Sequence, residues 1–222
     1  MHIIKPCWYK NNIIKGRHSD SPLIAHVPKV LRRRLGEFGY NVLSVMDLCS
    51  PNNESDNMIW VMSSRHGDTN RMVQLFQNIT DNELLSPTNF SMSVHNALPA
   101  MYSIKTKNTS MHTAVSAGIH SFSLGLLEAY VLCKTTKQTI GYLYYDFKLH
   151  DVYSTLAIDN QEAIIIGMTL DYTDESDLFL EYQHIKQNDF SFHLNNLIRF
   201  FCNNNDICEI SMPCGQFTIK KI

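Results

Sequence analysis

The segment 110–133, SMHTAVSAGIHSFSLGLLEAYVLC, constrains the fold more than any other part of the 222-residue chain. It predicts a short strand (110–114) that runs through a turn of small residues into a helix (about 117–133). Such a turn places its central residue at a helix N-terminus, where backbone N–H groups stabilise negative charge. A cysteine there would be a reactive thiolate, but the sequence has Val115, with Ser116 beside it. Because valine can neither attack a substrate nor exchange a proton, a packed structural turn is the favoured interpretation.

Strand and helix patterns alternate along the rest of the chain. The expected strands are 2–4, 58–63, 139–145, 162–172 and one in the tail 208–222, and the expected helices are 28–48, 69–79, 89–104 and 190–202. Gly39 is expected to end or bend the first of these helices, and Pro99 to bend the third. This alternation predicts an α/β layered fold in a single domain, residues 1–222.

Charge and residue usage exclude several classes of protein. With 19 Lys and Arg against 21 Asp and Glu, a net charge of -2, there is no electrostatic case for nucleic-acid binding. The basic run at 29–34 is interpreted as a solvated helix face. The six cysteines and ten histidines are scattered without metal-ligand spacing, and we expect neither a metal nor a cofactor. No apolar run reaches about 20 residues and no signal peptide is recognisable, so we expect a cytoplasmic protein without a membrane span.

Short motifs in a fixed order resemble those of a known family. They are Leu31-Arg32-Arg33-Arg34-Leu35, Ser64-Arg65-His66-Gly67, Ser86-Pro87-Thr88 with Phe90, Ser93-Val94-His95-Asn96-Ala97, Ser116-Ala117-Gly118, Leu126-Leu127-Glu128-Ala129 and Tyr145-Asp146. Over about residues 28–172 the chain resembles the N-terminal half of the β-ketoacyl synthases, and residues 173–222 are a C-terminal extension beyond the matching part. It is most similar to a shorter, β-ketoacyl synthase-like branch found beside aryl polyene and flexirubin pigment genes. The resemblance implies a thiolase-like layered fold, as a single N-terminal-type half.

The resemblance implies a subunit that does not condense acyl chains. Val115 stands at the position of the family's nucleophilic cysteine. Active members have two similar halves, and their two catalytic histidines lie in the second half, whose motifs do not occur around His184 or His193. We therefore expect a chain-length-factor-like subunit that forms a heterodimer with a full-length β-ketoacyl synthase in polyene or polyketide-type lipid biosynthesis. The acyl carrier protein is the expected transient partner.

The resemblance also implies roles for individual residues. Those expected to line an acyl tunnel or to face the partner are Phe90, Met92, His95, Asn96, Met101, Thr113 and Val115, although Phe90, Met92 and Met101 suit an ordinary core equally well. The segment 101–115 is expected at the subunit interface. Arg65, His66 and Gly67 are expected to form a loop at a strand end, with Gly67 in an unusual backbone conformation. Arg65 or His66 would pair with a buried carboxylate such as Glu128.

Two other functions remain open from the sequence. A residual acyl-thioester enzyme, of the thioesterase or decarboxylase type, would use Ser116 or His95 as its weak catalytic candidates. A stand-alone acyl-binding protein would need no ketosynthase partner. The run 63–68 also contains serines, a histidine and an aspartate, the groups of a hydrolase triad. Triads are assembled from distant segments as a rule, which argues against that interpretation.

Overall fold

The computed structural model describes residues 1–10, 13–16, 27–50, 57–156, 162–172, 176–185, 194–203 and 205–222. The expected turn at 51–57 lies outside this part of the chain except for Asn57. The start of the helix predicted over 190–202 also lies outside it, together with His193.

The described strands form one mixed sheet in the order β4-β3-β5-β6-β1-β7-β9-β8, with β2 beside β1. Their bounds are β1 His2–Lys10, β2 Ile13–Gly16, β3 Ile59–Ser63, β4 His112–Val115, β5 Ile140–Asp146, β6 Ile164–Asp171, β7 Leu178–Gln183, β8 Ile207–Met212 and β9 Gly215–Lys221. β3 is parallel to both β4 and β5, and the other pairs of described strands are antiparallel. The carboxyl ends of β3, β4 and β5 therefore meet at one end of the sheet.

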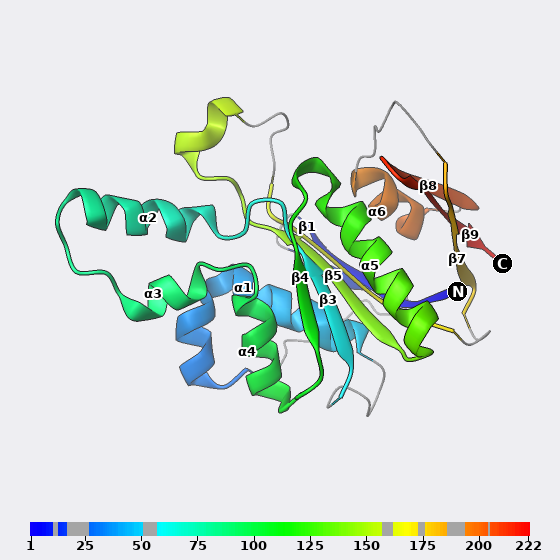
Figure 1. Cartoon of the computed structure of the whole chain (residues 1–222), viewed down its shortest axis with the longest axis horizontal. Coiled ribbons are helices and arrows are strands. Elements are labelled where there is room, and N and C mark those ends of the chain that lie inside the picture. The colour runs from blue at the N-terminus through cyan, green and yellow to red at the C-terminus, as the bar shows by residue number, and fades with distance from the viewer. Residues whose placement is uncertain are drawn as a thin grey trace.

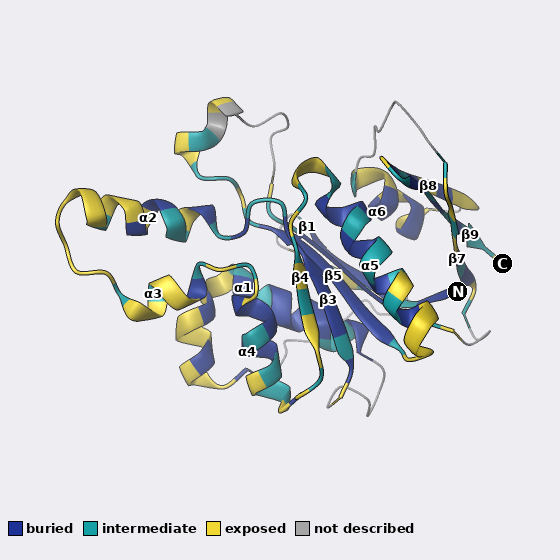
Figure 2. Ribbon diagram, in the orientation of Figure 1, coloured by how far each residue is buried: buried dark blue, intermediate teal, exposed yellow. Residues whose placement is uncertain are grey.

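Helices cover both faces of the sheet (Figure 1). Their bounds are α1 Lys29–Cys49, α2 Thr69–Thr80, α3 Pro87–Met92, α4 Ala97–Thr106, α5 Ser121–Thr136 and α6 Leu194–Cys202. Successive strand side chains point to opposite faces: Trp60 and Met62 pack in the core beneath α1 and α4, whereas Val61 packs in the core beneath α5 and α6. Figure 2 shows the buried residues gathered in the strands between these helix layers. The expected α/β layered fold is confirmed.

The ends and bends of several elements differ from the expectations. The first helix bends at Gly36, where φ is 65°, and not at Gly39, which is buried inside the helix. A φ of this sign is freely available to glycine, so the bend is placed there. The tail forms a hairpin of two strands, β8 and β9, where one strand was expected. A further strand that was not expected, β7, precedes this hairpin. The start of the second helix is as expected, since the Asp68 carboxylate accepts the Arg71 N–H at 3.0 Å.

Candidate functional site

A buried carboxylate joins the carboxyl ends of β3 and β5. Asp146, the last residue of β5, is 1% exposed. Its Oδ1 accepts hydrogen bonds from the Ser64 hydroxyl (2.9 Å) and from the backbone N–H groups of Arg65 (2.9 Å) and His66 (3.2 Å), and its Oδ2 accepts one from the Tyr144 hydroxyl. Burial, followed by the charge of Asp146, raises the pKa of Tyr144, so this hydroxyl stays protonated and donates. Asp146 therefore fixes the loop that follows β3.

The loop after β3 turns at Gly67, whose φ of 63° favours glycine. Its N–H donates to the Ser64 hydroxyl oxygen at 2.8 Å. The imidazole of His95 lies against Gly67, because a Cβ added there would be 3.2 Å from His95 Cε1. The carbonyl of His95 accepts a hydrogen bond from the Tyr145 hydroxyl at 2.9 Å. The structure thus brings His95 beside the loop that contains Arg65 and His66.

The carboxylate that contacts this loop differs from the expected one. Arg65 and His66 donate their backbone N–H groups to Asp146, whereas Glu128 lies half-buried on α5. Neighbouring parallel strands bring their carboxyl ends together, so Asp146 at the end of β5 lies next to the end of β3. Glu128 is seven residues beyond Ser121, the first residue of α5, which places it about 10 Å along the helix from that residue.

The connection from β4 to α5 is longer than expected. β4 ends at Val115, and α5 begins only at Ser121, after a 3-10 turn over Gly118–His120. Val115 is therefore not at a helix N-terminus, and its half-buried side chain packs against the core. The Ser121 hydroxyl accepts a hydrogen bond from the Ala117 N–H (2.9 Å) and donates to the Gly118 carbonyl (2.8 Å). The Ser121 hydroxyl thus satisfies one backbone N–H and one backbone carbonyl of the turn.

The hydroxyl groups near this connection have partners other than catalytic bases. Ser116 is exposed, and its hydroxyl donates to the Arg65 carbonyl at 3.3 Å, its one side-chain hydrogen bond within the described ranges. In the run 63–68, the Ser63 hydroxyl bonds that of Tyr142 (2.8 Å), and Ser64 bonds Asp146. Among the described residues, the structure therefore assembles neither a serine–base pair at Ser116 nor a triad from the run 63–68.

β4 forms one edge of the described sheet. The carbonyls of Met111 and Val115 accept hydrogen bonds from N–H groups of β3 and of the residue after it (3.3 and 3.1 Å). Because backbone groups alternate in direction along a strand, the N–H and C=O groups of His112 and Ala114 point away from β3. Both residues are exposed, whereas Thr113 and Val115 are half-buried. β4 thus presents a strand edge to which another strand can be added.

A second exposed surface, the apolar arm, lies on α2, α3 and the loop between them. Figure 1 shows these helices extending away from the sheet. The arm has large apolar side chains with exposed fractions from 39% to 97%: Phe76, Ile79, Leu84, Leu85 and Phe90. The Arg71 guanidinium holds the two helices together, since it donates to Asp68 of the loop before α2 (3.1 Å) and to Asn89 of α3 (2.9 Å). A cluster of exposed apolar side chains is typical of an interaction surface.

The other residues expected at a tunnel or interface lie in three different environments, buried, exposed and half-buried. Met92 and Met101 are buried in the core beneath α1, so of the two expectations for these side chains the ordinary core applies. Phe90 is 62% exposed on the apolar arm, and Asn96 is exposed just before α4. His95 is half-buried, and its Nε2 is enclosed without a hydrogen-bond partner among the described residues.

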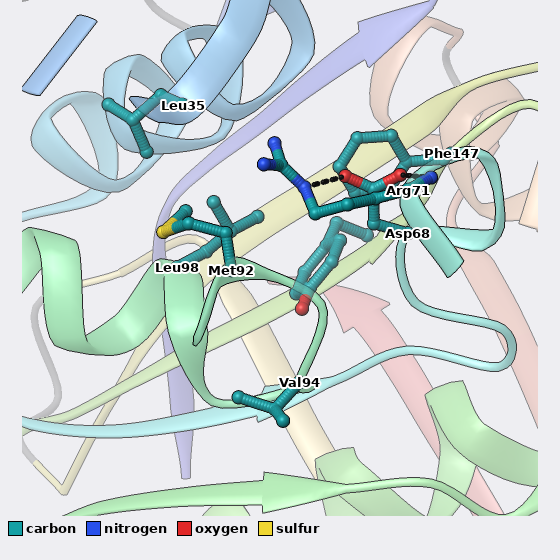
Figure 3. Close-up of a pocket in the computed structure, with 8 residues that line it drawn as sticks. Leu35, Asp68, Arg71, Met92, Val94, Leu98 and Phe147 are labelled. Carbon is teal, nitrogen blue, oxygen red and sulfur yellow. Dashed lines mark hydrogen bonds and ion pairs between the residues drawn. The ribbon is translucent and has the colours of Figure 1, made fainter. Parts of the chain in front are cut away.

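A small open pocket, with room for little more than a water molecule, lies where the apolar arm meets the sheet. Apolar and aromatic side chains line it beside the ion pair of Asp68 and Arg71, which Figure 3 shows. They come from α1, from α3, α4 and the loop between them, and from the end of β5 and the residue after it: Leu35, Met92, Val94, Leu98, Tyr145 and Phe147. Of these lining residues, Met92 is one that was expected at an acyl tunnel or interface.

The described residues contain neither a metal-ligand cluster nor a membrane-spanning helix. Within those ranges, no group of three or more His, Cys, Asp and Glu side chains is placed to hold a metal ion. No helix in the same part of the chain combines the length and the apolar character that crossing a membrane requires.

His66 gives the site a testable pH dependence. Burial lowers its pKa; the charge of Asp146 opposes this effect, and Arg65 and His95 add to it. The folded protein then binds this proton less readily than the unfolded chain, so the free energy of unfolding is expected to fall as pH drops below about 6.5. In His66→Gln the loss between about pH 7 and pH 5 should be smaller, as measured by urea denaturation. Equal losses in the two proteins would contradict this prediction.

Solved structures share this fold. A chain of the complex of the ketosynthase ApeO with its chain length factor ApeC from Xenorhabdus doucetiae is similar over 99% of this chain and 98% of its own, with 20% identity and a TM-score of 0.74. The ishigamide ketosynthase/chain length factor is similar over 71% of this chain and 51% of its own, with 12% identity and a TM-score of 0.56. A β-ketoacyl synthase from Burkholderia phymatum is similar over 67% of this chain and 45% of its own, with 13% identity and a TM-score of 0.54. The chain thus spans about half the length of the latter two proteins.

The sequence comparisons point to the same family. No curated protein sequence matches the chain. The family profile described as β-ketoacyl synthase, N-terminal domain, matches residues 7–210, which extends well beyond the expected limits of 28–172 at both ends. The chain therefore belongs to the β-ketoacyl synthase family, and its fold is the thiolase-like fold of the ketosynthases.

Proposed function

We propose that the chain is a non-condensing, chain-length-factor-like subunit that pairs with a full-length β-ketoacyl synthase. The observation that carries the proposal is its similarity, over nearly the whole of both chains, to a chain of the ApeO–ApeC complex. A similarity that covers both chains from end to end favours the same kind of subunit. By contrast, the similarity covers less than half of the Burkholderia phymatum β-ketoacyl synthase.

The side chains near the end of β4 support a role without condensation. Val115, at the position that resembles the family's nucleophile, is apolar and packs against the core. A serine nucleophile needs a base that takes its proton, but the Ser116 hydroxyl donates to the Arg65 carbonyl. His95 lies against Gly67, and its imidazole is not hydrogen-bonded to Ser116 in the described structure. These contacts give no support to a residual thioester-cleaving enzyme.

Two exposed surfaces support a heterodimer. The edge of β4 leaves backbone groups available for pairing with a strand of the ketosynthase, and the apolar arm offers side chains that a partner would cover. The proposal includes a cytoplasmic pair that takes acyl chains from an acyl carrier protein and makes a polyene or polyketide-type lipid. In that pair residues 1–222 act as a single domain, and the apolar arm borders the acyl tunnel.

Phe90 provides the test of the tunnel role. Its side chain is 62% exposed, so Phe90→Ala and Phe90→Trp should change the free energy of unfolding by no more than about 0.5 kcal/mol. In the reconstituted pair we expect longer products with Phe90→Ala and shorter ones with Phe90→Trp, because the substitutions widen and narrow the tunnel border. Mass spectrometry of the carrier-bound products measures this. Met101 does not suit the test, since truncating this buried side chain would cost about 2 kcal/mol or more.

The control for Phe90 is Ile207→Ala. Ile207 is 56% exposed on β8, at the opposite edge of the sheet from β4. Its truncation removes exposed apolar surface without touching the apolar arm. An unchanged product distribution in folded Phe90 variants, or the same change in Ile207→Ala, would count against a tunnel border at Phe90.

A further inference from the structure

Two of the six cysteines meet on the face of the sheet that α1 covers. Cys7 of β1 is 4% exposed, and Cys49, the last residue of α1, is 0% exposed. Both belong to the core beneath α1 and α4, whereas Cys133 and Cys208 belong to the core on the opposite face. The sheet therefore separates Cys7 and Cys49 from the other two buried cysteines.

Gly167 of β6 lets the two side chains approach each other. In the ladder of β1 and β6, Gly167 is paired with Cys7, and the side chains of such a cross-strand pair lie on the same face, with Cβ atoms about 5 Å apart. Gly167 has no side chain, and the Cys49 sulfur fills that place, because a Cβ added at Gly167 would be 2.6 Å from it. The Cys49 sulfur thus lies where a cross-strand neighbour of Cys7 would lie, and the two thiols are hydrogen-bonded. A disulfide needs thiols on facing side chains, and this arrangement supplies them.

A break in the ladder of β1 and β6 lies next to this pair. The register shifts just before Cys7, where Lys5 and Pro6 form a bulge and Lys5 has a φ of 46°. Proline contributes no N–H group to the ladder. The Lys5 ammonium donates to the Ser50 carbonyl at 3.2 Å, so a cation lies beside the residue that follows Cys49. A cation stabilises a nearby thiolate, and an interrupted ladder opens locally more readily than a continuous one.

We propose that Cys7 and Cys49 form a redox-active pair that a small peroxide converts into a disulfide. Hydrogen peroxide is small enough to enter through a local opening of the bulge. The Cys7 thiolate attacks one peroxide oxygen, which gives a sulfenic acid and one molecule of water. The Cys49 sulfur then attacks the Cys7 sulfur and forms the disulfide, and the leaving hydroxide takes up the Cys49 proton to give a second water. Two thiols are oxidised and one peroxide is reduced to two molecules of water.

The order of the two steps follows from the burial of the two thiols. Burial raises the pKa of the Cys49 thiol well above its usual value, and the contact with Cys7 acts in the same direction. Cys7 is the more accessible sulfur, so it attacks the peroxide first and Cys49 resolves the product. The disulfide fastens β1 to the end of α1 and closes the segment 7–49 into a loop.

The test maps the disulfide in the full chain after treatment with about 1 mM hydrogen peroxide. Iodoacetamide blocks the remaining thiols, and the protein is digested with trypsin. Trypsin cleaves after Lys and Arg but not before Pro, so Cys7 and Cys49 fall in the peptides 1–10 and 35–65, each with a single cysteine. Mass spectrometry should find these two peptides joined, and dithiothreitol should separate them. Cys202 is exposed, and its oxidation shows that the peroxide has acted.

Two variants and one change of condition make the result specific. Cys133→Ala is the matched control, since Cys133 is 0% exposed in the opposite core, and it should leave the joined peptides unchanged. Cys49→Ala should abolish them and leave Cys7 as a sulfenic or sulfinic acid. In about 8 M urea their share should fall several-fold, because the cysteines of an unfolded chain pair by chance. The inference is overturned if the two peptides stay unjoined while Cys202 is oxidised, or if folded and unfolded chains join them equally.

Discussion

Ala114→Pro should weaken the association with a ketosynthase by about 100-fold, roughly 3 kcal/mol, without unfolding the chain. Ala114 lies in the edge strand β4, with its N–H pointing away from β3. Proline removes that donor and places its ring in the path of an added strand. The pairing of β4 with β3 uses the alternate residues, so the free energy of unfolding should change by no more than about 1 kcal/mol. Surface plasmon resonance and urea denaturation measure the two quantities.

Two neighbouring substitutions make the Ala114→Pro test specific. Ala114→Ser keeps the outward N–H and should bind the ketosynthase almost as wild type does. Thr113→Pro removes a donor on the side that faces β3, so it should destabilise the fold itself by about 3 kcal/mol. Full affinity in a folded Ala114→Pro protein would show that the edge of β4 is not the contact with the ketosynthase.

Asp146→Ala should lower the free energy of unfolding by about 3 kcal/mol or more, a large share of the 5–15 kcal/mol typical of a domain. The substitution leaves the Ser64 hydroxyl, two backbone N–H groups and the Tyr144 hydroxyl without their acceptor in a buried site. Because these donors belong to β5 and to the loop after β3, we also expect faster hydrogen exchange at residues 64–67. Urea denaturation and exchange mass spectrometry check the two effects.

Asp146→Asn is the matched control, because its amide oxygen can still accept from Ser64, Arg65 and His66. We expect it to lose less than half as much stability as Asp146→Ala. A loss below about 0.5 kcal/mol in Asp146→Ala would show that the carboxylate does not hold the strand ends together.

Much of the fold was predictable because its central strands are short apolar runs. β3, β5 and β6 are rich in apolar, β-branched and aromatic residues, as expected for strands buried on both faces. β1 was predicted for only three of its nine residues. Lys5 has φ 46°, and the register shifts between Ile4 and Cys7, so a bulge interrupts the strand pattern next to Pro6. β7 was not predicted, since its six residues begin with three apolar ones and alternate with polar residues only over the last four.

The candidate site was less predictable because its contacts join distant parts of the sequence. Three of the four hydrogen-bond partners of Asp146 lie about 80 residues earlier in the sequence, whereas the resemblance points to Glu128 as the buried carboxylate. The small-residue turn after β4 was recognised, while the shift of the helix start to Ser121 depends on one hydroxyl that bonds both Ala117 and Gly118. Phe90 is exposed, whereas Met92 and Met101 are buried. The sequence spacing alone does not distinguish these two environments.

Native mass spectrometry of the chain co-expressed with a full-length β-ketoacyl synthase from the same genome tests the proposed function most directly. The ketosynthase should contain the cysteine that this chain replaces by Val115. We predict a complex with one copy of each chain, which persists through size-exclusion chromatography. A stable monomer of this chain beside a homodimer of the ketosynthase would contradict the proposal.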